Sequence, residues 1–108
     1  MTRIEFFNPA GRIEGFCCSG HSGYGEEGAD ILCAAISAAI NLTVTTISDV
    51  MGVKVKTKVK EDEARITLKL PASCEEDEDA VQDLLSGLML YLCSLRDDYP
   101  NNIEVMEV

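Results

Sequence analysis

Short segments with alternating apolar and polar residues open the chain and predict a pair of strands. Residues 2–8 place Ile4 and Phe6 on one face of a strand, and residues 12–18 form a second alternating segment. The sequence Asn8-Pro9-Ala10-Gly11 between them is typical of a turn. An antiparallel hairpin is therefore predicted at the start of the chain.

A long apolar segment follows over residues 31–50 and predicts a helix rich in alanine and isoleucine. Asp30 directly precedes this segment and has the side chain preferred at a helix N-cap. The polar residues of the segment are few and small, so we expect this helix to be mostly buried.

Two further alternating segments, residues 53–60 and 64–70, flank the turn Glu61-Asp62-Glu63 and predict a second antiparallel hairpin. Its core-facing positions are expected to be Val53, Val55, Val59, Ile66, Leu68 and Leu70. Its solvent-facing positions are basic: Lys54, Lys56, Lys58, Lys60, Arg65 and Lys69.

The last part of the chain predicts a second helix and a final strand. Acidic residues over 75–79 suit the first turn of a helix, which continues to about Arg96. Residues 103–108 then form a short strand, which completes the order ββαββαβ. This order predicts an α+β fold, a two-layer sandwich with two helices packed on one face of a mostly antiparallel sheet. The apolar stripe of the second helix consists of Val81, Leu84, Leu85, Leu88, Leu92 and Leu95.

Length and composition restrict the class of protein. The chain has 108 residues, 46% of them hydrophobic, which predicts one folded domain over residues 1–108 and excludes global disorder. No apolar run is expected to reach the ~18 residues of a membrane helix, and the N-terminus lacks the apolar segment of a signal peptide. We therefore expect a cytoplasmic protein that does not bind membranes, in which the five cysteines are reduced thiols.

Charge is strongly negative on average but unevenly distributed. The formal net charge is −10, which argues against non-specific binding of DNA or RNA by the chain as a whole. Residues 53–70 nevertheless hold six of the nine basic residues. This basic face could contact RNA, but it contains no aromatic side chain for base stacking. A solvated face, paired in part with Glu5, Glu14 and Glu104 across the sheet, is the simpler interpretation.

The residues with potential chemistry lie between the second strand and the first helix. His21 is the only histidine of the chain and lies in a glycine-rich loop, and Cys33 would occupy the third position of the predicted helix. The amide groups and dipole of a first helical turn favour a thiolate and can stabilise an oxyanion. A histidine from the preceding loop could act as general base towards such a thiol. Ser37 would lie one turn further on the same helical face.

Each of these residues also has a structural interpretation. A cysteine in an alanine-rich helix is often a small buried hydrophobic residue, and Asp30 can cap the helix or orient His21. A zinc site would need Cys17, Cys18, His21 and Cys33, but adjacent cysteines on a strand point to opposite faces. We therefore expect no metal and no other cofactor. Cys74 and Cys93 show no pattern that suggests a partner.

The segments Gly20-His21-Ser22-Gly23-Tyr24 and Gly28-Ala29-Asp30-Ile31-Leu32-Cys33-Ala34-Ala35-Ile36-Ser37 resemble the signature of the family of ribosomal-processing cysteine protease Prp. Length, element order and the acidic second helix are also similar to that family, so the resemblance extends over the whole chain. From the residues alone, a domain that binds the ribosome through its lysine-rich face without enzymatic activity remains the alternative.

The resemblance implies a cysteine endopeptidase with Cys33 as nucleophile and His21 as general base, and with Gly20, Asp30 and Ser37 shaping the site. It implies a substrate, the N-terminal extension of large-subunit ribosomal protein number twenty-seven, cut after Phe-Phe and before a small residue. It also implies a homodimer. The loop between histidine and cysteine is mobile in the family, and here it contains Ser22, Gly23, Tyr24, Gly25 and Gly28.

Overall fold

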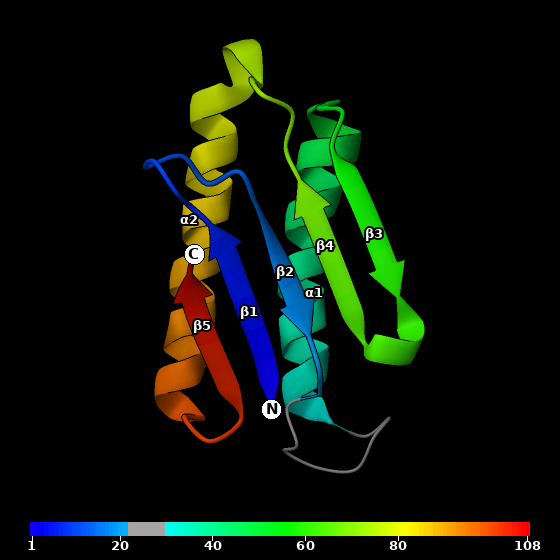
Figure 1. Ribbon diagram of the computed structural model, residues 1–108, viewed down its shortest axis with the longest axis vertical. Helices are drawn as coiled ribbons and strands as arrows, with labels where there is room; N and C mark the ends of the chain where they lie inside the picture. Colours follow the sequence, from blue (N-terminus) through cyan, green and yellow to red (C-terminus); the bar gives the residue numbers. More distant parts are fainter. Residues whose placement is uncertain (22–29) are drawn as a thin grey trace.

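The computed structural model, which describes residues 1–21 and 30–108, has two helices packed on one face of a five-stranded sheet (Figure 1). This confirms the predicted α+β fold and its element order. The elements are β1 (Thr2–Phe7), β2 (Gly15–Ser19), α1 (Ile31–Thr45), β3 (Lys56–Lys60), β4 (Arg65–Lys69), α2 (Glu78–Asp98) and β5 (Ile103–Glu107).

The strands lie in the order β3-β4-β2-β1-β5, so the two hairpins are adjacent and β5 returns to the edge beside β1. Only the β1–β5 pair is parallel among the strands described. A parallel pair needs a crossover connection, and α2 together with the segments around it provides one. The sheet is thus mostly antiparallel, as predicted.

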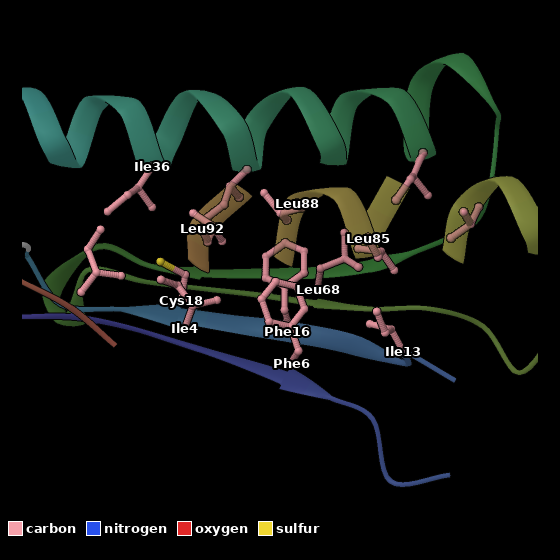
Figure 2. Close-up of a cluster of buried hydrophobic side chains, with 14 of the residues drawn as sticks. Ile4, Phe6, Ile13, Phe16, Cys18, Ile36, Leu68, Leu85, Leu88 and Leu92 are labelled. Atoms are coloured by element: carbon pink, nitrogen blue, oxygen red, sulfur yellow. The ribbon is translucent and has the colours of Figure 1, made fainter. Parts of the chain in front are cut away.

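The core lies between the helices and the inner face of the sheet, where side chains from both layers interdigitate (Figure 2). Phe6 and Phe16 are fully buried neighbours on β1 and β2, with ring centroids 5.8 Å apart. The α2 stripe is buried as predicted at Val81, Leu85, Leu88 and Leu92.

The second strand starts later than predicted, at Gly15 rather than at residue 12. Arg12 and Ile13 instead contact α2: the backbone N–H of Ile13 donates to Gln82 Oε1 (2.9 Å), and Gln82 Nε2 donates to the Ile13 carbonyl (2.9 Å). These contacts draw the chain from the sheet towards the helix layer. An alternating pattern alone does not reveal such a side-chain contact.

The predicted helix over residues 31–50 ends as α1 at Thr45 and continues as a π-helical turn over Thr46–Val50. Ile31–Val50 is long and apolar enough to cross a membrane by length and composition, contrary to the expectation that no segment would be. In the fold, however, its inner side chains pack into the core as those of a core helix do. Its buried residues are only Leu32, Ile36, Ile40, Thr43 and Ile47, so the expectation of a mostly buried helix is wrong.

The strand predicted from residue 53 begins at Lys56, because the backbone N–H of Val53 donates to the Ile47 carbonyl (3.1 Å) at the end of the helical segment. Val59 was expected in the core but is 63% exposed. β3 is an edge strand. Near its C-terminal end, the face that points towards the helix layer is not covered by a helix.

Glu104 pairs with Arg3 (3.3 Å) rather than with a lysine of the second hairpin. Among the described residues, Glu5 and Glu14 form no ion pair either. The basic face therefore does not receive the predicted cross-sheet pairing.

A partly buried ion pair connects the first hairpin to α2. Arg12 Nε donates to Glu78 Oε2 (2.7 Å), and a second guanidinium nitrogen donates to Glu78 Oε1 (3.0 Å) and to the Pro71 carbonyl (3.0 Å). Glu78 also accepts from the backbone N–H of Cys74 (3.0 Å). The Arg12 hydrogen bond, followed by that of Cys74, lowers the pKa of Glu78 from 4.5 to about 2.

We expect Glu78→Gln to lower the free energy of unfolding by about 1–2 kcal/mol at pH 6, because it removes a charge-assisted bidentate pair. Since the folded pKa of Glu78 is depressed, its contribution is fully present above pH 4.5 and is lost as the pH falls towards 2. The stability difference between wild type and variant should therefore shrink over this range. Urea unfolding at several pH values measures it, and a difference independent of pH would contradict the assignment.

Candidate active site

The candidate site lies at the end of the sheet where β2 ends and α1 begins, at the lower end of the molecule in Figure 1. The turn between β3 and β4 reaches the same end. Three segments that are separate in the sequence therefore converge on one region.

Asp30 is the N-cap of α1, as predicted. Its backbone is extended (φ −78°, ψ 102°), and its side-chain Oδ1 accepts a hydrogen bond from the backbone N–H of Cys33 (3.1 Å). Cys33 is therefore the third helical residue and lies in the first turn of α1. The cap has a chemical consequence: the Cys33 amide is engaged, so the amides of Ile31 and Leu32 are the remaining early amides without an acceptor inside the helix.

Gly20 directs the chain from the end of β2 to His21. Its φ of +86° lies in the left-handed region, and a Cβ atom there would be 2.5 Å from the Met1 carbonyl oxygen. Its backbone N–H donates to the carbonyl of Ala64 (3.1 Å), in the turn between β3 and β4. A glycine is thus required on two grounds, and it fixes the exit of the chain from β2 towards His21.

His21 and Cys33 line the same cavity, which has a volume of about 680 Å³. His21 is exposed and Cys33 is half-buried, so both side chains are accessible to a ligand in the cavity. The structure also brings the other predicted site residues together here, because Gly20, Asp30 and Ser37 line this cavity as well.

The sequence did not indicate the opposite wall of the cavity. The second hairpin contributes Val59, Lys60, Glu61, Arg65 and Ile66 to the lining, from the end of β3 through the turn to β4. The exposure of Val59 is explained by this position, because its side chain faces an open cleft rather than the core. The alternating pattern predicted these residues on two strands and the turn between them. It did not show where α1 ceases to pack on the second hairpin.

Thr2 is a second residue that the sequence did not single out. It is 2% exposed and lines the cavity, and its Oγ1 has no hydrogen-bond partner in the part of the chain that the structure describes. A buried hydroxyl without a partner is unusual. It provides an additional polar group at the floor of the cleft.

The remaining cysteines are less suited to nucleophilic attack than Cys33. Burial, together with the nearby Cys17 and Cys33, raises the pKa of Cys18 to about 12, so this thiol stays protonated. Burial also raises the pKa of Cys74. Cys17 faces the other side of the sheet, where its sulfur accepts from Thr67 Oγ1 (3.6 Å).

Cys17 and Cys18 thus point to opposite faces, as strand geometry predicted. Within residues 1–21 and 30–108, no group of three or more His, Cys, Asp or Glu side chains is arranged to hold a metal ion. The predicted mobile loop, with Ser22, Gly23, Tyr24, Gly25 and Gly28, lies outside the described residues.

Comparison with known proteins gives the family. The family model described as cysteine protease Prp matches residues 1–104. The chain belongs to the Prp family. It is therefore a cysteine protease, and the alternative of a domain without enzymatic activity is set aside. It is 27% identical over 94 residues to the ribosomal processing cysteine protease Prp of Bacillus subtilis, a match that covers 86% of this chain and 84% of the relative.

Solved structures share the fold over the full chain. A Staphylococcus aureus Prp in complex with a covalently linked product peptide superposes with a TM-score of 0.87 at 22% identity, covering 100% of both chains. A Streptococcus mutans protein has a TM-score of 0.83 at 25% identity, covering 100% of this chain and 96% of the other. The two-layer arrangement of this chain is thus the fold of solved Prp proteins.

The N-cap has a direct test. We expect Asp30→Ala to lower the free energy of unfolding by about 1 kcal/mol, because the Cys33 amide loses its acceptor, whereas Asp30→Ser should cost less than about 0.5 kcal/mol because serine also caps. Chemical denaturation measures both. Equal losses for the two variants would show that the stabilising role of Asp30 is not the cap.

Proposed function

We propose that Cys33 and His21 form the catalytic pair of this protease and that the cleft holds the substrate peptide. The observation that supports the pair most strongly is their placement in one cavity, with Cys33 in the first turn of a capped helix. Cys18, the other thiol of the cavity, is held protonated by burial, which leaves Cys33 as the available nucleophile.

In the proposed reaction, His21 accepts the proton of the Cys33 thiol, and the sulfur attacks the carbonyl carbon of the scissile peptide bond. The early amides of α1, those of Ile31 and Leu32, are placed to donate hydrogen bonds to the developing oxyanion. The protonated His21 then transfers its proton to the leaving amine, and a thioester to Cys33 remains. Water, deprotonated by His21, hydrolyses this thioester and restores the free thiol.

The proposed substrate is the N-terminal extension of large-subunit ribosomal protein number twenty-seven, cut after Phe-Phe and before a small residue. The B. subtilis relative is named a ribosomal processing protease, and S. aureus Prp has been solved with a substrate peptide and with a covalently linked product peptide. A covalently linked product in that protein is what a thiol nucleophile would form.

The cleft has a suitable apolar lining for such a peptide. Ile36 and Ile40 on α1 and Val59 and Ile66 on the second hairpin line the cavity. Burial of a phenylalanine side chain in an apolar site contributes roughly 1.5–3 kcal/mol, so two aromatic side chains can provide much of the selectivity. We assign the aromatic subsites to these four side chains.

We expect the wild-type protein to cut a peptide bearing the ribosomal extension once, after the second phenylalanine, and Cys33→Ala to lose at least about 1,000-fold in rate. His21→Ala should lose on the order of 100- to 10,000-fold, because the general base is removed. Mass spectrometry of the products gives the site and the rate.

The matched substrate control replaces Phe-Phe by Ala-Ala, and the matched protein control is Cys93→Ala, on α2 and outside the cleft. Full activity of Cys33→Ala would contradict the nucleophile, and equal cleavage of the Ala-Ala peptide would contradict the aromatic subsites. A peptide left intact by the wild type, with the full-length ribosomal protein also left intact, would contradict the substrate.

We further propose that the protein acts in the cytoplasm as a homodimer. Cysteines 17, 18, 33, 74 and 93 are free thiols, as a reducing compartment favours. Part of the outer surface of the helix layer is apolar: a shallow hollow is lined by Ala35, Ala38, Leu42 and Tyr91, and Leu42 is 70% exposed.

A second copy of the chain suits this helix surface. Residues 31–48 contain no charged side chain, so two negatively charged copies can approach here without placing like charges in contact. A two-fold dimer uses the same surface on both copies, which a continuous apolar hollow allows.

We expect Leu42→Asp to convert the dimer to a monomer, because it places a charge in the proposed interface, while Val108→Asp at an exposed position on the sheet edge should leave the dimer intact. Sedimentation velocity measures the mass of each. A monomeric wild type, or a Leu42→Asp variant that stays dimeric, would show that this surface is not the interface.

A further inference from the structure

The outer face of the second hairpin is a strongly basic surface on an acidic protein. The basic face consists of Lys56, Lys58 and Lys60 on β3 and Arg65 and Lys69 on β4, all exposed, and Lys54 precedes β3. The chain as a whole has a net charge of −10. Six of its nine basic residues are therefore concentrated on this hairpin.

The strand register places like charges directly opposite each other. Lys56 pairs with Lys69, and Lys60 pairs with Arg65, so each pair projects from the same face of adjacent strands. Like charges at directly opposed positions destabilise a sheet. This arrangement is unfavourable for the isolated domain and becomes favourable when an anion binds between the charges.

The described part of the chain does not provide that anion. No ion pair joins any of the five lysines to a described carboxylate, and Arg65 pairs with Glu63 of the adjoining turn (3.4 Å). Glu104, expected to pair with this face, binds Arg3 at the opposite edge of the sheet. Sequence alone favours a solvated face, whereas the structure leaves Lys56, Lys69 and Lys60 of the opposed pairs without an ion pair to a described carboxylate.

We propose that the basic face binds the phosphate backbone of double-helical RNA without reading its sequence. The face spans roughly 13 Å along the strands, since alternate residues are roughly 6.6 Å apart. Each strand of a duplex carries one charge per roughly 3.4 Å of axis, so several phosphates fall within this length. β3 and β4 carry no aromatic side chain, which favours backbone contact over base stacking.

The composition of the face favours RNA over an acidic protein. A stable protein interface needs a buried apolar or aromatic anchor. None of the large apolar side chains exposed in the described structure lies on this face, since Val59 points to the cleft side. Phosphate contacts by lysine need no such anchor. The choice of RNA rather than DNA rests on the proposed function, in which the substrate is a ribosomal protein.

The basic face adjoins the cleft. Lys60 and Arg65 belong to the face and also line the cavity that contains His21 and Cys33. An RNA duplex on the face would therefore lie beside the peptide groove. A ribosomal protein already bound to its RNA could present its extension to the cleft while the RNA holds the protease in place.

Binding is measured by fluorescence anisotropy of a labelled RNA duplex with the full-length Cys33→Ala protein, over a series of salt concentrations. The test variant adds Lys56→Gln, Lys58→Gln and Lys69→Gln, which line no part of the cavity. We expect its affinity to fall at least about tenfold near 100 mM salt, and the slope of log affinity against log salt to decrease by about two to three.

The matched control carries the same net charge as the triple variant. It adds Ala80→Glu, Ser94→Glu and Asn101→Asp, at exposed positions on or next to α2, and leaves the basic face intact. We expect its affinity to stay within about threefold of the parent. Equal weakening of both variants would overturn the proposal, because only overall charge would then matter. Circular dichroism checks that both are folded.

Three further results would overturn the proposal: no binding of the RNA duplex at low salt, tighter binding of a DNA duplex or of poly-glutamate, or self-association that the triple lysine variant abolishes. The last would assign the face to the acidic surface of a second copy. Because the parent protein carries Cys33→Ala, the RNA result does not depend on cleavage. A failure of RNA binding leaves the protease assignment standing, and a failure of peptide cleavage leaves the RNA result standing.

Discussion

Two helices cannot cover five strands, and the site of this protein depends on that constraint. α1 and α2 bury the inner face of β1, β2 and β4, where Phe6, Phe16 and Leu68 are fully enclosed. The far end of β3 extends beyond this cover, so Val59 stays exposed. The uncovered part of the sheet becomes one wall of the cleft, and the first turns of α1 become the other.

The end of the cleft that contains His21 and Cys33 is held by hydrogen bonds that backbone N–H groups donate. Asp30 fixes the start of α1 through the Cys33 amide, and Gly20 joins the exit of β2 to the β3–β4 turn through the Ala64 carbonyl. Ala64 itself adopts a left-handed conformation (φ 46°) in that turn. Each hydrogen bond fixes a segment whose backbone conformation is already restricted, so the backbone positions of His21, Cys33 and the β3–β4 turn are set by the fold.

The sequence predicted the features that depend on local patterns. Alternation located the five strands, although β2 and β3 begin later than predicted. Four of the six residues of the predicted α2 stripe are buried, and Leu84 and Leu95 pack against the core partly buried. Asp30 was predicted as the cap because the first turn of a helix has backbone N–H groups that need an acceptor. The resemblance of the segments around Gly20-His21 and Cys33 to a family signature indicated the candidate active site.

Features that depend on long-range contacts were not predictable in this way. Arg12 and Ile13 leave the sheet because of Glu78 and Gln82, which lie more than sixty residues away along the chain. The exposure of Val59, and the Thr2 hydroxyl that has no hydrogen-bond partner among the described residues, depend on where another element ends. An alternating pattern states which residues share a face but not what covers that face.

The distribution of charge connects the cleft to the outer sheet face. A uniformly acidic enzyme would attract a basic ribosomal protein but would be repelled by the RNA that such a protein binds. The separation of the two signs of charge along the chain resolves this conflict. Residues 71–108, which include α2, hold ten of the nineteen acidic residues, whereas residues 53–70 hold six of the nine basic ones. Lys60 and Arg65 stand where the basic face meets the cleft, and Glu61 lines the same cavity between them. Both signs of charge therefore meet where the cleft adjoins the basic face, which is the arrangement that the proposed capture of an RNA-bound substrate by the lysines of β3 requires.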